Sequence, residues 1–303
     1  MGLAKLSLYL STIGGLSLLF AFLLSVVHTT LVAGARRPAA GGLAAAGAGS
    51  GGDAAVTFGG PSTATTTAGS IAHAFTWIAC ITLGLSLLTR GIVVGRGPWG
   101  NMYEFSVAFA FGITAGWLFL RHRYPIATVA VVPLGVALFL VGYAATLPSS
   151  IEPLVPALDN APLLTIHVAM AMIAYGIFAT SFGAAVAYLA QGPHDRFAWL
   201  PSHRVLDEVA WRAVIIGFPV FATMIVLGSV WASIAWGRYW GWDPKETAAL
   251  VTWLIYAVYL HARNQRGWAG RPSALILVIG FGAVLFTYFG NLFFSGLHAY
   301  SGL

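Results

Sequence analysis

The stretch "APLLTIHVAMAMIAYGIFATSFGAAVAYLA", residues 161–190, contains no Asp, Glu, Lys or Arg. About 20 apolar residues are enough for an α-helix to cross the hydrocarbon core of a bilayer, so this stretch predicts a membrane-spanning helix. Seven other mainly apolar runs follow the same pattern, at residues 5–33, 71–94, 104–120, 125–147, 210–232, 246–262 and 273–294. The sequence therefore predicts an all-α, polytopic integral membrane protein with about eight transmembrane helices.

The composition agrees with this fold class. Of 303 residues, 58% are hydrophobic and 8% are charged, and the mean hydropathy is +0.83, well beyond the range of water-soluble domains. Residues 1–33 are too long a segment, and lack the Ala-x-Ala ending, for a cleaved signal peptide, so we expect a retained N-terminal helix. Residues 34–70 are mostly Gly, Ala, Ser and Thr, which predicts a flexible linker. Residues 71–303 then form the main membrane domain.

The basic residues predict an orientation. Because eight spans place successive loops on alternate sides, ten of the 15 Lys and Arg residues fall on one side: Arg36, Arg37, Arg121, Arg123, Arg196, Arg204, Arg212, Arg263, Arg266 and Arg271. The other side receives five: Lys5, Arg90, Arg96, Arg238 and Lys245. The positive-inside rule makes the first side cytoplasmic, so both termini are expected outside the cytoplasm, in a multi-pass protein of the cell (plasma) membrane. The charges form no basic face, which argues against nucleic-acid binding.

A second stretch, "WASIAWGRYWGWDPKET" at residues 231–247, gathers aromatic residues on the predicted outer side. Asp243, Pro244 and Glu246 have the pattern of a helix start with a capping box. The tryptophans allow two interpretations. They could form an interfacial aromatic belt. Alternatively, Trp236 and Trp240, four residues apart, could share one helical face and offer an apolar shelf for a flat macrocycle.

An iron-containing macrocycle needs axial ligands, for which the histidines are the candidates. His167, early in the fifth run, and His298, just after the eighth, converge on the outer face with the tryptophans. Three others lie near the predicted cytoplasmic ends of their runs, where ligand and packing roles both remain open: His28, His73 and His261. The remaining three lie in basic loops and are expected to be solvated: His122, His194 and His203. Cys80 is the single cysteine, so thiol redox chemistry is not expected.

Two motifs carry a family resemblance. The segment "WGRYWGWDPKET", residues 236–247, resembles the tryptophan-rich WWD motif of the superfamily that handles haem during cytochrome c biogenesis. The segment "GPWGNMYEF", residues 97–105, resembles the Asn-Met/Leu-Tyr-Glu segment of the Ccs/Res-type branch. The resemblance covers most of residues 71–303.

The resemblance implies a set of haem contacts. His167 and His298 match the two external axial ligands, and His261 matches the histidine of an inner haem site. The second ligand of that inner site is His73 or a group on a partner subunit. The tryptophan segment is expected to contact the cofactor, haem b, through four residues: Trp231, Trp236, Trp240 and Trp242. Arg238 and Lys245 are candidates to pair with the haem propionates, with headgroup contact as the alternative for Lys245.

The implied function is binding and translocation of haem, and its presentation at the outer membrane face for covalent attachment to apocytochrome c. The implied partners are a Ccs/Res-type membrane subunit with a large outward domain and the Cys-x-x-Cys-His segment of apocytochrome c, within the lipid bilayer. The chain would then be a subunit of a cytochrome c synthase that forms thioether bonds. One alternative is a haem exporter or chaperone that delivers haem to a separate ligase. Another is a transporter with an aromatic gate, which the lack of visible repeats disfavours.

Overall fold

The structure is a computed structural model, and it describes residues 2–35, 63–151, 153, 161–192, 194–265, 268–290 and 293–298. Within these residues it contains eight α-helices, one 3₁₀ turn and no strand. The elements are α1 (Leu3–Ala35), α2 (Thr63–Val94), α3 (Met102–Arg123), η1 (Ala127–Val129), α4 (Val131–Ala145), α5 (Ala161–Gln191), α6 (His203–Trp236), α7 (Pro244–Arg263) and α8 (Arg271–Phe289).

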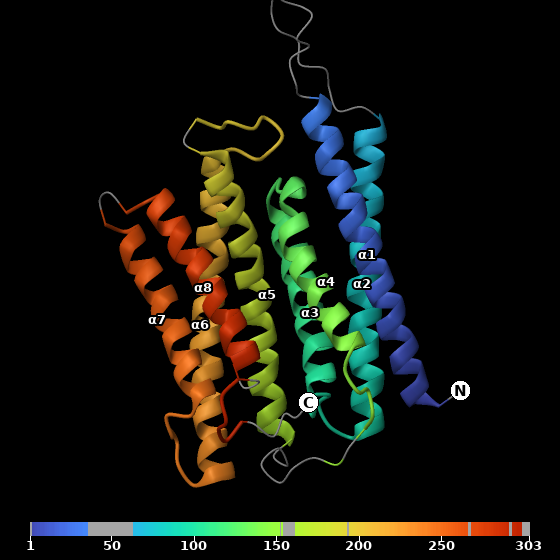
Figure 1. The fold of residues 1–303 in the computed structure, drawn as a ribbon, viewed down its shortest axis with the longest axis vertical. Helices are drawn as coiled ribbons and strands as arrows, with labels where there is room; N and C mark the ends of the chain where they lie inside the picture. The colour runs from blue at the N-terminus through green and yellow to red at the C-terminus, as the bar shows by residue number, and fades with distance from the viewer. Residues whose placement is uncertain are drawn as a thin grey trace, which may run out of the picture.

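The helices run alternately up and down in a bundle, and α1 starts and α8 ends at the lower end of the view in Figure 1. Seven helices are long and apolar enough to cross a membrane. The remaining one, α7, runs alongside α8. Lys245 and Glu246 at its start, and His261 and Arg263 at its end, make α7 less apolar than the others. The expected all-α, polytopic membrane fold is confirmed.

The second helix starts earlier than the sequence predicted. It begins at Thr63 instead of residue 71, so the end of the expected linker is helical. Thr65, Ala68 and Gly69 are buried, and Nδ1 of His28 in α1 donates a hydrogen bond to the Thr65 carbonyl at 2.9 Å. Packing against α1 thus outweighs the weak helix preference of threonine and glycine. The rest of the predicted linker, residues 36–62, lies outside the described residues.

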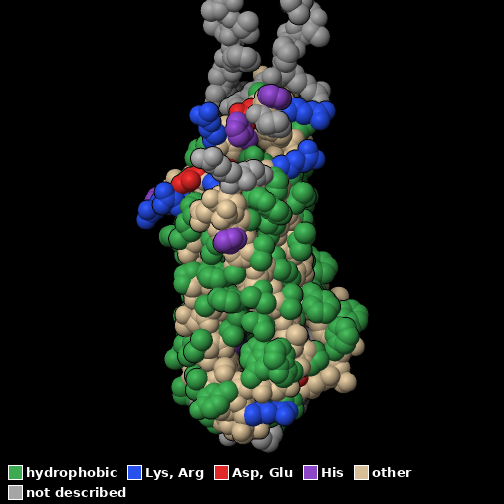
Figure 2. All heavy atoms as spheres, turned by 90° about the vertical axis from the view of Figure 1, so that its left-hand side faces the viewer, with side chains coloured by type: hydrophobic (Ala, Val, Ile, Leu, Met, Phe, Trp, Pro, Cys, Tyr) green, Lys and Arg blue, Asp and Glu red, His purple; other side chains and the backbone are tan. Residues whose placement is uncertain are grey.

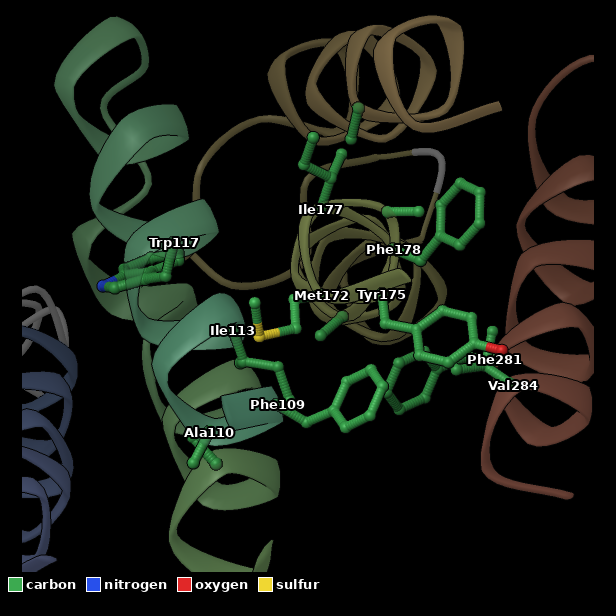
Figure 3. Packing of buried hydrophobic residues seen from close by; sticks show 14 of the residues in the cluster. Phe109, Ala110, Ile113, Trp117, Met172, Tyr175, Ile177, Phe178, Phe281 and Val284 are labelled. Carbon is green, nitrogen blue, oxygen red and sulfur yellow. The ribbon is translucent and has the colours of Figure 1, made fainter. Parts of the chain in front are cut away.

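Glycines allow α3 and α5 to pack closely in the centre of the bundle. A Cβ atom on Gly116 would lie 2.8 Å from the carbonyl carbon of Gly176, and one on Gly112 would lie 2.6 Å from the Met172 carbonyl oxygen. Small residues at such positions are typical of tightly packed membrane helices. Figure 3 shows the aromatic core beside this contact, where Phe109 of α3 and Tyr175 of α5 lie together. The close packing fixes α5 relative to α3.

The Asn-Met-Tyr-Glu segment takes part in a network of hydrogen bonds and ion pairs around the buried Glu104, at the lower end of the bundle. Asn101 caps α3 by accepting a hydrogen bond from the Glu104 N–H. The Glu104 carboxylate is buried and accepts from Nε of Arg90 at 2.8 Å and from the Gly100 N–H at 2.6 Å. Arg96 is its second cationic neighbour, at 3.4 Å. This network joins the end of α2 to the start of α3.

Charge is distributed unevenly over the surface. Figure 2 shows an apolar middle band on one face of the molecule, with most of the Lys, Arg, Asp, Glu and His side chains of that face gathered towards its upper end. An uncharged band between polar ends is what a bilayer requires of a protein that spans it.

Candidate functional site

The candidate site is a largely apolar cavity at the lower end of the bundle, where α3, α5 and α7 begin and α6 and α8 end (Figure 1). Both predicted outer histidines line it, together with two of the predicted tryptophans. The lining residues that matter below are Met102, Phe105, Phe109, His167, Tyr175, Gly228, Trp231, Trp240, Lys245, Glu246, Tyr288 and His298. Residues from five helices, from the connection between α6 and α7 and from the segment after α8 therefore meet at one place.

His167 is held by α6. Its Nδ1 lies 2.8 Å from the Met224 carbonyl oxygen, and because a carbonyl can only accept, Nδ1 carries the proton. The neutral ring then has an unprotonated Nε2. The ring also rests on Gly228, where a Cβ atom would lie only 2.7 Å from Cε1 of His167. The hydrogen bond and the missing side chain together set the orientation of the imidazole.

His298 is held by Asp243. Nδ1 of His298 lies 2.7 Å from Oδ1 of the buried carboxylate, which also accepts hydrogen bonds from the backbone N–H groups of Lys245 at 2.9 Å and Leu297 at 2.6 Å. Burial raises the pKa of Asp243, but the contact with His298 and the two backbone donors outweigh it and hold that pKa at about 2. Burial lowers the pKa of His298, the hydrogen bond and charge of Asp243 raise it, and the charge of Lys245 lowers it, so that the pKa lies below its ordinary value. At neutral pH, His298 is therefore a neutral ring that donates from Nδ1 to a carboxylate.

The four tryptophans occupy different positions. Trp236 is the last residue of α6, because Gly237 follows in a left-handed conformation with φ 71°. The expectation that Trp236 and Trp240 share one helical face is therefore wrong. Trp236 contacts Trp231 at 4.7 Å and His298 at 4.9 Å between ring centroids, both edge to face. Trp240 lines the cavity, whereas Trp242 is 68% exposed and does not. Two of the tryptophans line the cavity, one packs behind His298, and one lies on the surface.

Of the other predicted site residues, Lys245 lines the cavity and the rest lie elsewhere. Arg238 is exposed and does not line the cavity, whereas Lys245 does. His261 is exposed in the last turn of α7, at the far end of the bundle from the cavity. His73 lies in α2, where its Nε2 accepts a hydrogen bond from Nε1 of Trp77 at 3.3 Å. Since α2 and α7 lie at opposite edges of the bundle in Figure 1, the structure does not bring His73 and His261 together.

Aromatic side chains form the inner wall of the cavity. Phe109 stacks on Tyr175 with ring centroids 5.2 Å apart and meets Tyr288 edge to face at 5.1 Å. The Tyr288 hydroxyl is hydrogen-bonded to Ser106 at 2.6 Å. Phe109 and Tyr175 of this wall also belong to the buried core shown in Figure 3, and the wall gives the cavity an apolar surface on that side.

The segment that carries the Glu104 network also contacts α5, the helix that carries His167. Nε1 of Trp99 donates to Oγ1 of Thr165, two residues before His167, at 3.3 Å. Met102 and Phe105 of the same segment line the cavity. The two motifs found in the sequence therefore meet at one site.

The family model described as "Cytochrome C assembly protein" matches residues 99–298, from Trp99, two residues before Asn101, to His298. The chain belongs to the cytochrome c assembly family. It is 34% identical over 260 residues to the cytochrome c biogenesis protein CcsA of Guillardia theta, covering 77% of this chain and 86% of that protein. It is also 34% identical over 276 residues to CcsA of Synechococcus elongatus, covering 74% and 85% of the two chains.

These relatives confirm the resemblance to the Ccs/Res-type branch, so the chain is a cytochrome c assembly protein of CcsA type. They support a role for it in cytochrome c maturation. A solved structure of the cytochrome c haem lyase CcmF has the same fold, with a TM-score of 0.68 and 18% identity. The similarity covers 95% of this chain but only 47% of CcmF, so the chain spans about half the length of that protein. At this identity the likeness concerns the fold alone.

Several site residues could not be assigned from the sequence. Asp243 was interpreted as a helix cap, and it is one, but the structure adds its hydrogen bond to His298, which is 55 residues further along the chain. Gly228 and the Met224 carbonyl, which orient His167, carry no local signal at all. Only the spatial arrangement of α5 and α6 identifies them.

Proposed function

We propose that this protein binds haem b in the cavity, with His167 and His298 as the axial ligands, and presents it for covalent attachment to apocytochrome c. One observation carries this proposal. Two histidines from distant parts of the chain line one apolar cavity, and each donates its Nδ1–H to an oxygen acceptor. Histidines that bind metals through Nε2 typically donate from Nδ1 in this way, because the second hydrogen bond fixes the tautomer and the ring orientation.

The surroundings of the two histidines fit a haem. Apolar and aromatic side chains on several sides suit a planar macrocycle, and the rest of the wall is supplied by Trp231 and Trp240. Bound haem would supply the two vinyl groups that react with the thiols of apocytochrome c. The role of this chain would be to hold those groups in a fixed position, which is the positional contribution to catalysis. It would thus act as a subunit of a cytochrome c synthase.

We also propose that haem passes through an inner site at His261 before it reaches the cavity. His261 lies 16 residues after Lys245, or about 24 Å along the axis of α7, and so cannot join the outer pair of ligands. An ionisable side chain exposed on a membrane helix favours a functional role, because its burial in lipid is costly. His73 is distant from it, which favours a group on a Ccs/Res-type partner subunit as the second ligand. The cavity end would face outward, as the positive-inside rule predicts.

Co-expression with an apocytochrome c and the partner subunit tests this function. The intact chain should give cytochrome with covalently attached haem, and the His167→Ala, His298→Ala double variant should give none while still accumulating in the membrane. His261→Ala should lower the yield, and haem supplied from outside should restore it. Full cytochrome assembly by the double variant would refute the role of the cavity. Haem release without any attachment, even with the partner present, would instead favour the exporter or chaperone alternative.

A further inference from the structure

A second cavity lies between α1, α3 and α4, at the end of the bundle where α1 and α3 start (Figure 1). It has a volume of about 510 Å³ and shares no lining residue with the cavity that contains His167 and His298. We call it the groove, and its lining includes Leu8, Ser11 and Leu19 of α1, Tyr103 of α3, and Val141 and Gly142 of α4.

The lining of the groove favours hydrocarbon over a polar ligand. Among the described residues, none that lines it is charged, and four carry a hydroxyl group: Ser11, Thr12, Tyr103 and Ser149. The Ser11 and Thr12 hydroxyls each donate to the Leu8 carbonyl at 2.9 Å, and the Tyr103 hydroxyl is hydrogen-bonded to Ser11 at 2.7 Å. Since three of the four hydroxyls already have partners within the protein, the groove offers few polar contacts to a ligand or to water.

The groove has the size of one acyl chain of a lipid. Its lining on α1 extends from Leu8 to Leu19, about 16 Å along the helix axis. The hydrocarbon depth of one bilayer leaflet is about 15 Å, half of the hydrocarbon core. A cavity of about 150 Å³ holds the six carbon atoms of benzene, so about 510 Å³ corresponds to about 18 carbon atoms. Length and volume therefore both match a single acyl chain.

The groove is too small for a membrane-spanning helix of a partner. A helix about 10 Å wide occupies about 120 Å³ per residue, so the groove has room for about one turn. Leu16 and Gly142, which line it, are exposed, so the groove is accessible from the side of the bundle that faces lipid.

Lys5 supplies a positive charge at one end of the groove. It precedes Leu8 by three residues and Thr12 by seven, so it lies on the same face of α1 as the lining. Lys5 is exposed, and the described residues give its ammonium group no ion pair or hydrogen bond. Arg90 and Arg96, by contrast, are already paired with Glu104. An anionic headgroup at the membrane surface would complement the charge of Lys5.

We propose that the groove binds one acyl chain of an anionic phospholipid and that Lys5 binds the phosphate of its headgroup. The chain would fill the space between α1 and α4, which already touch beside the groove, where a Cβ atom on Gly15 would lie 2.7 Å from Cγ1 of Val141. The bound lipid would thereby hold the N-terminal helix against the rest of the bundle. The site is separate from the proposed haem site and does not depend on it.

Gly142 allows the groove to be filled without disturbing the helices around it. A Cβ atom on Gly142 would have no neighbouring atom within 4 Å, so Gly142→Phe places an aromatic ring in the groove. Gly282→Phe in α8 is the matched control. Gly282 is also exposed and also has open space at its Cβ position, but it lies outside the groove.

The purified full chain is delipidated in detergent, mixed with phosphatidylglycerol or phosphatidylcholine of equal chain length, and analysed by native mass spectrometry. The wild type and Gly282→Phe should retain one phosphatidylglycerol per chain, and Gly142→Phe should retain none. Lys5→Met should retain lipid but lose about fivefold in its preference for phosphatidylglycerol, the effect of one basic residue near a membrane surface. The wild type should retain chains of about 18 carbons better than chains of about 10, because the shorter chain leaves part of the groove empty.

Three results would overturn the proposal. Equal retention of lipid by Gly142→Phe and Gly282→Phe would show that the groove is not the binding site. Equal retention of both chain lengths by the wild type would show the same without depending on how well a variant folds. An unchanged headgroup preference in Lys5→Met would refute the phosphate contact. If the wild type retains no lipid and Gly142→Phe no longer binds the partner subunit, the groove binds protein and the proposal is wrong.

Discussion

The carboxylate of Asp243 lies 2.7 Å from Nδ1 of His298, so one residue both starts a helix and orients a proposed iron ligand. The two residues are 55 positions apart in the chain, and the contact joins the tryptophan segment to the segment after α8. A similar pair, Asp195 and His203, lies at the opposite end of the molecule with a distance of 3.0 Å, but its side chains are 41% and 30% exposed. The contrast between these pairs provides a direct test.

Asp243→Asn should lower haem affinity at the outer site about 10–100-fold, the usual effect of removing a carboxylate that orients a metal-binding histidine. An amide replaces one acceptor oxygen with an NH₂ donor, which would face one of the donors now bound by Asp243, and it removes the negative charge. Titration of the purified variant with haem measures the change. Asp195→Asn should have no effect, and equal losses in the two variants would show that the Asp243 contact has no specific role.

The close contact between Gly228 and His167 leads to a second prediction. Gly228→Ala places a methyl group 2.7 Å from Cε1 of His167, so the ring must move and the outer haem site should be lost. The amount of protein in the membrane should stay near normal, since alanine is a better helix former than glycine. Gly282→Ala in α8 is the control, because no atom lies within 4 Å of its added Cβ. Unaltered haem content in Gly228→Ala would contradict the proposed orientation of His167.

The tryptophans should differ in their effects. Trp240→Ala removes part of the cavity wall and should lower haem occupancy, whereas Trp242→Ala should leave it unchanged, because Trp242 is 68% exposed and outside the cavity. Haem absorbance per protein in purified samples measures the difference. If both variants bind haem normally and both are depleted from the membrane, the tryptophans act as an interfacial belt instead.

Glu104 is expected to matter for stability more than for haem contact. Glu104→Gln leaves Arg90 buried without its carboxylate, and breaking such a pair typically costs about 3–5 kcal/mol. The thermal midpoint of unfolding in detergent should therefore fall clearly. Glu208→Gln, in the exposed pair with Arg212, should leave the midpoint unchanged. A variant at Glu104 with wild-type stability would mean that the Asn-Met-Tyr-Glu segment has another purpose.

Hydrophobic runs were sufficient to predict the helices, because the bilayer dictates both their length and their composition. The boundaries were less predictable. Residues 63–70 were expected to be a linker, since their composition favours no helix, but contacts with α1 that no local pattern reveals extend α2 through them. Likewise α6 continues to Trp236, where Gly237 ends it, and so separates two tryptophans that a simple helical repeat would place together.

The site was predictable in part. His167, His298, Trp231 and Trp240 could be named because the alternation of spans places them on one side of the membrane. Their supporting groups depend on contacts between helices that are distant in sequence, such as the Met224 carbonyl and Asp243. Both Lys245 and Arg238 could be named from their charge as candidate cations of the site. Only the lining of the cavity, which includes Lys245 and not Arg238, distinguishes them.

The central claim is that His167 and His298 together hold the haem. Its most direct test is the visible and electron paramagnetic resonance spectrum of the purified chain with iron protoporphyrin IX, for the wild type, His167→Ala, His298→Ala and the double variant. The account predicts a low-spin spectrum of two histidine ligands in the wild type, a changed ligation in each single variant, restored by added imidazole, and no outer-site haem in the double variant. His122→Ala should match the wild type, because His122 is exposed in the last turn of α3, which is not the loop position predicted from the sequence, and does not line the cavity. An unchanged low-spin spectrum in the double variant would contradict the account.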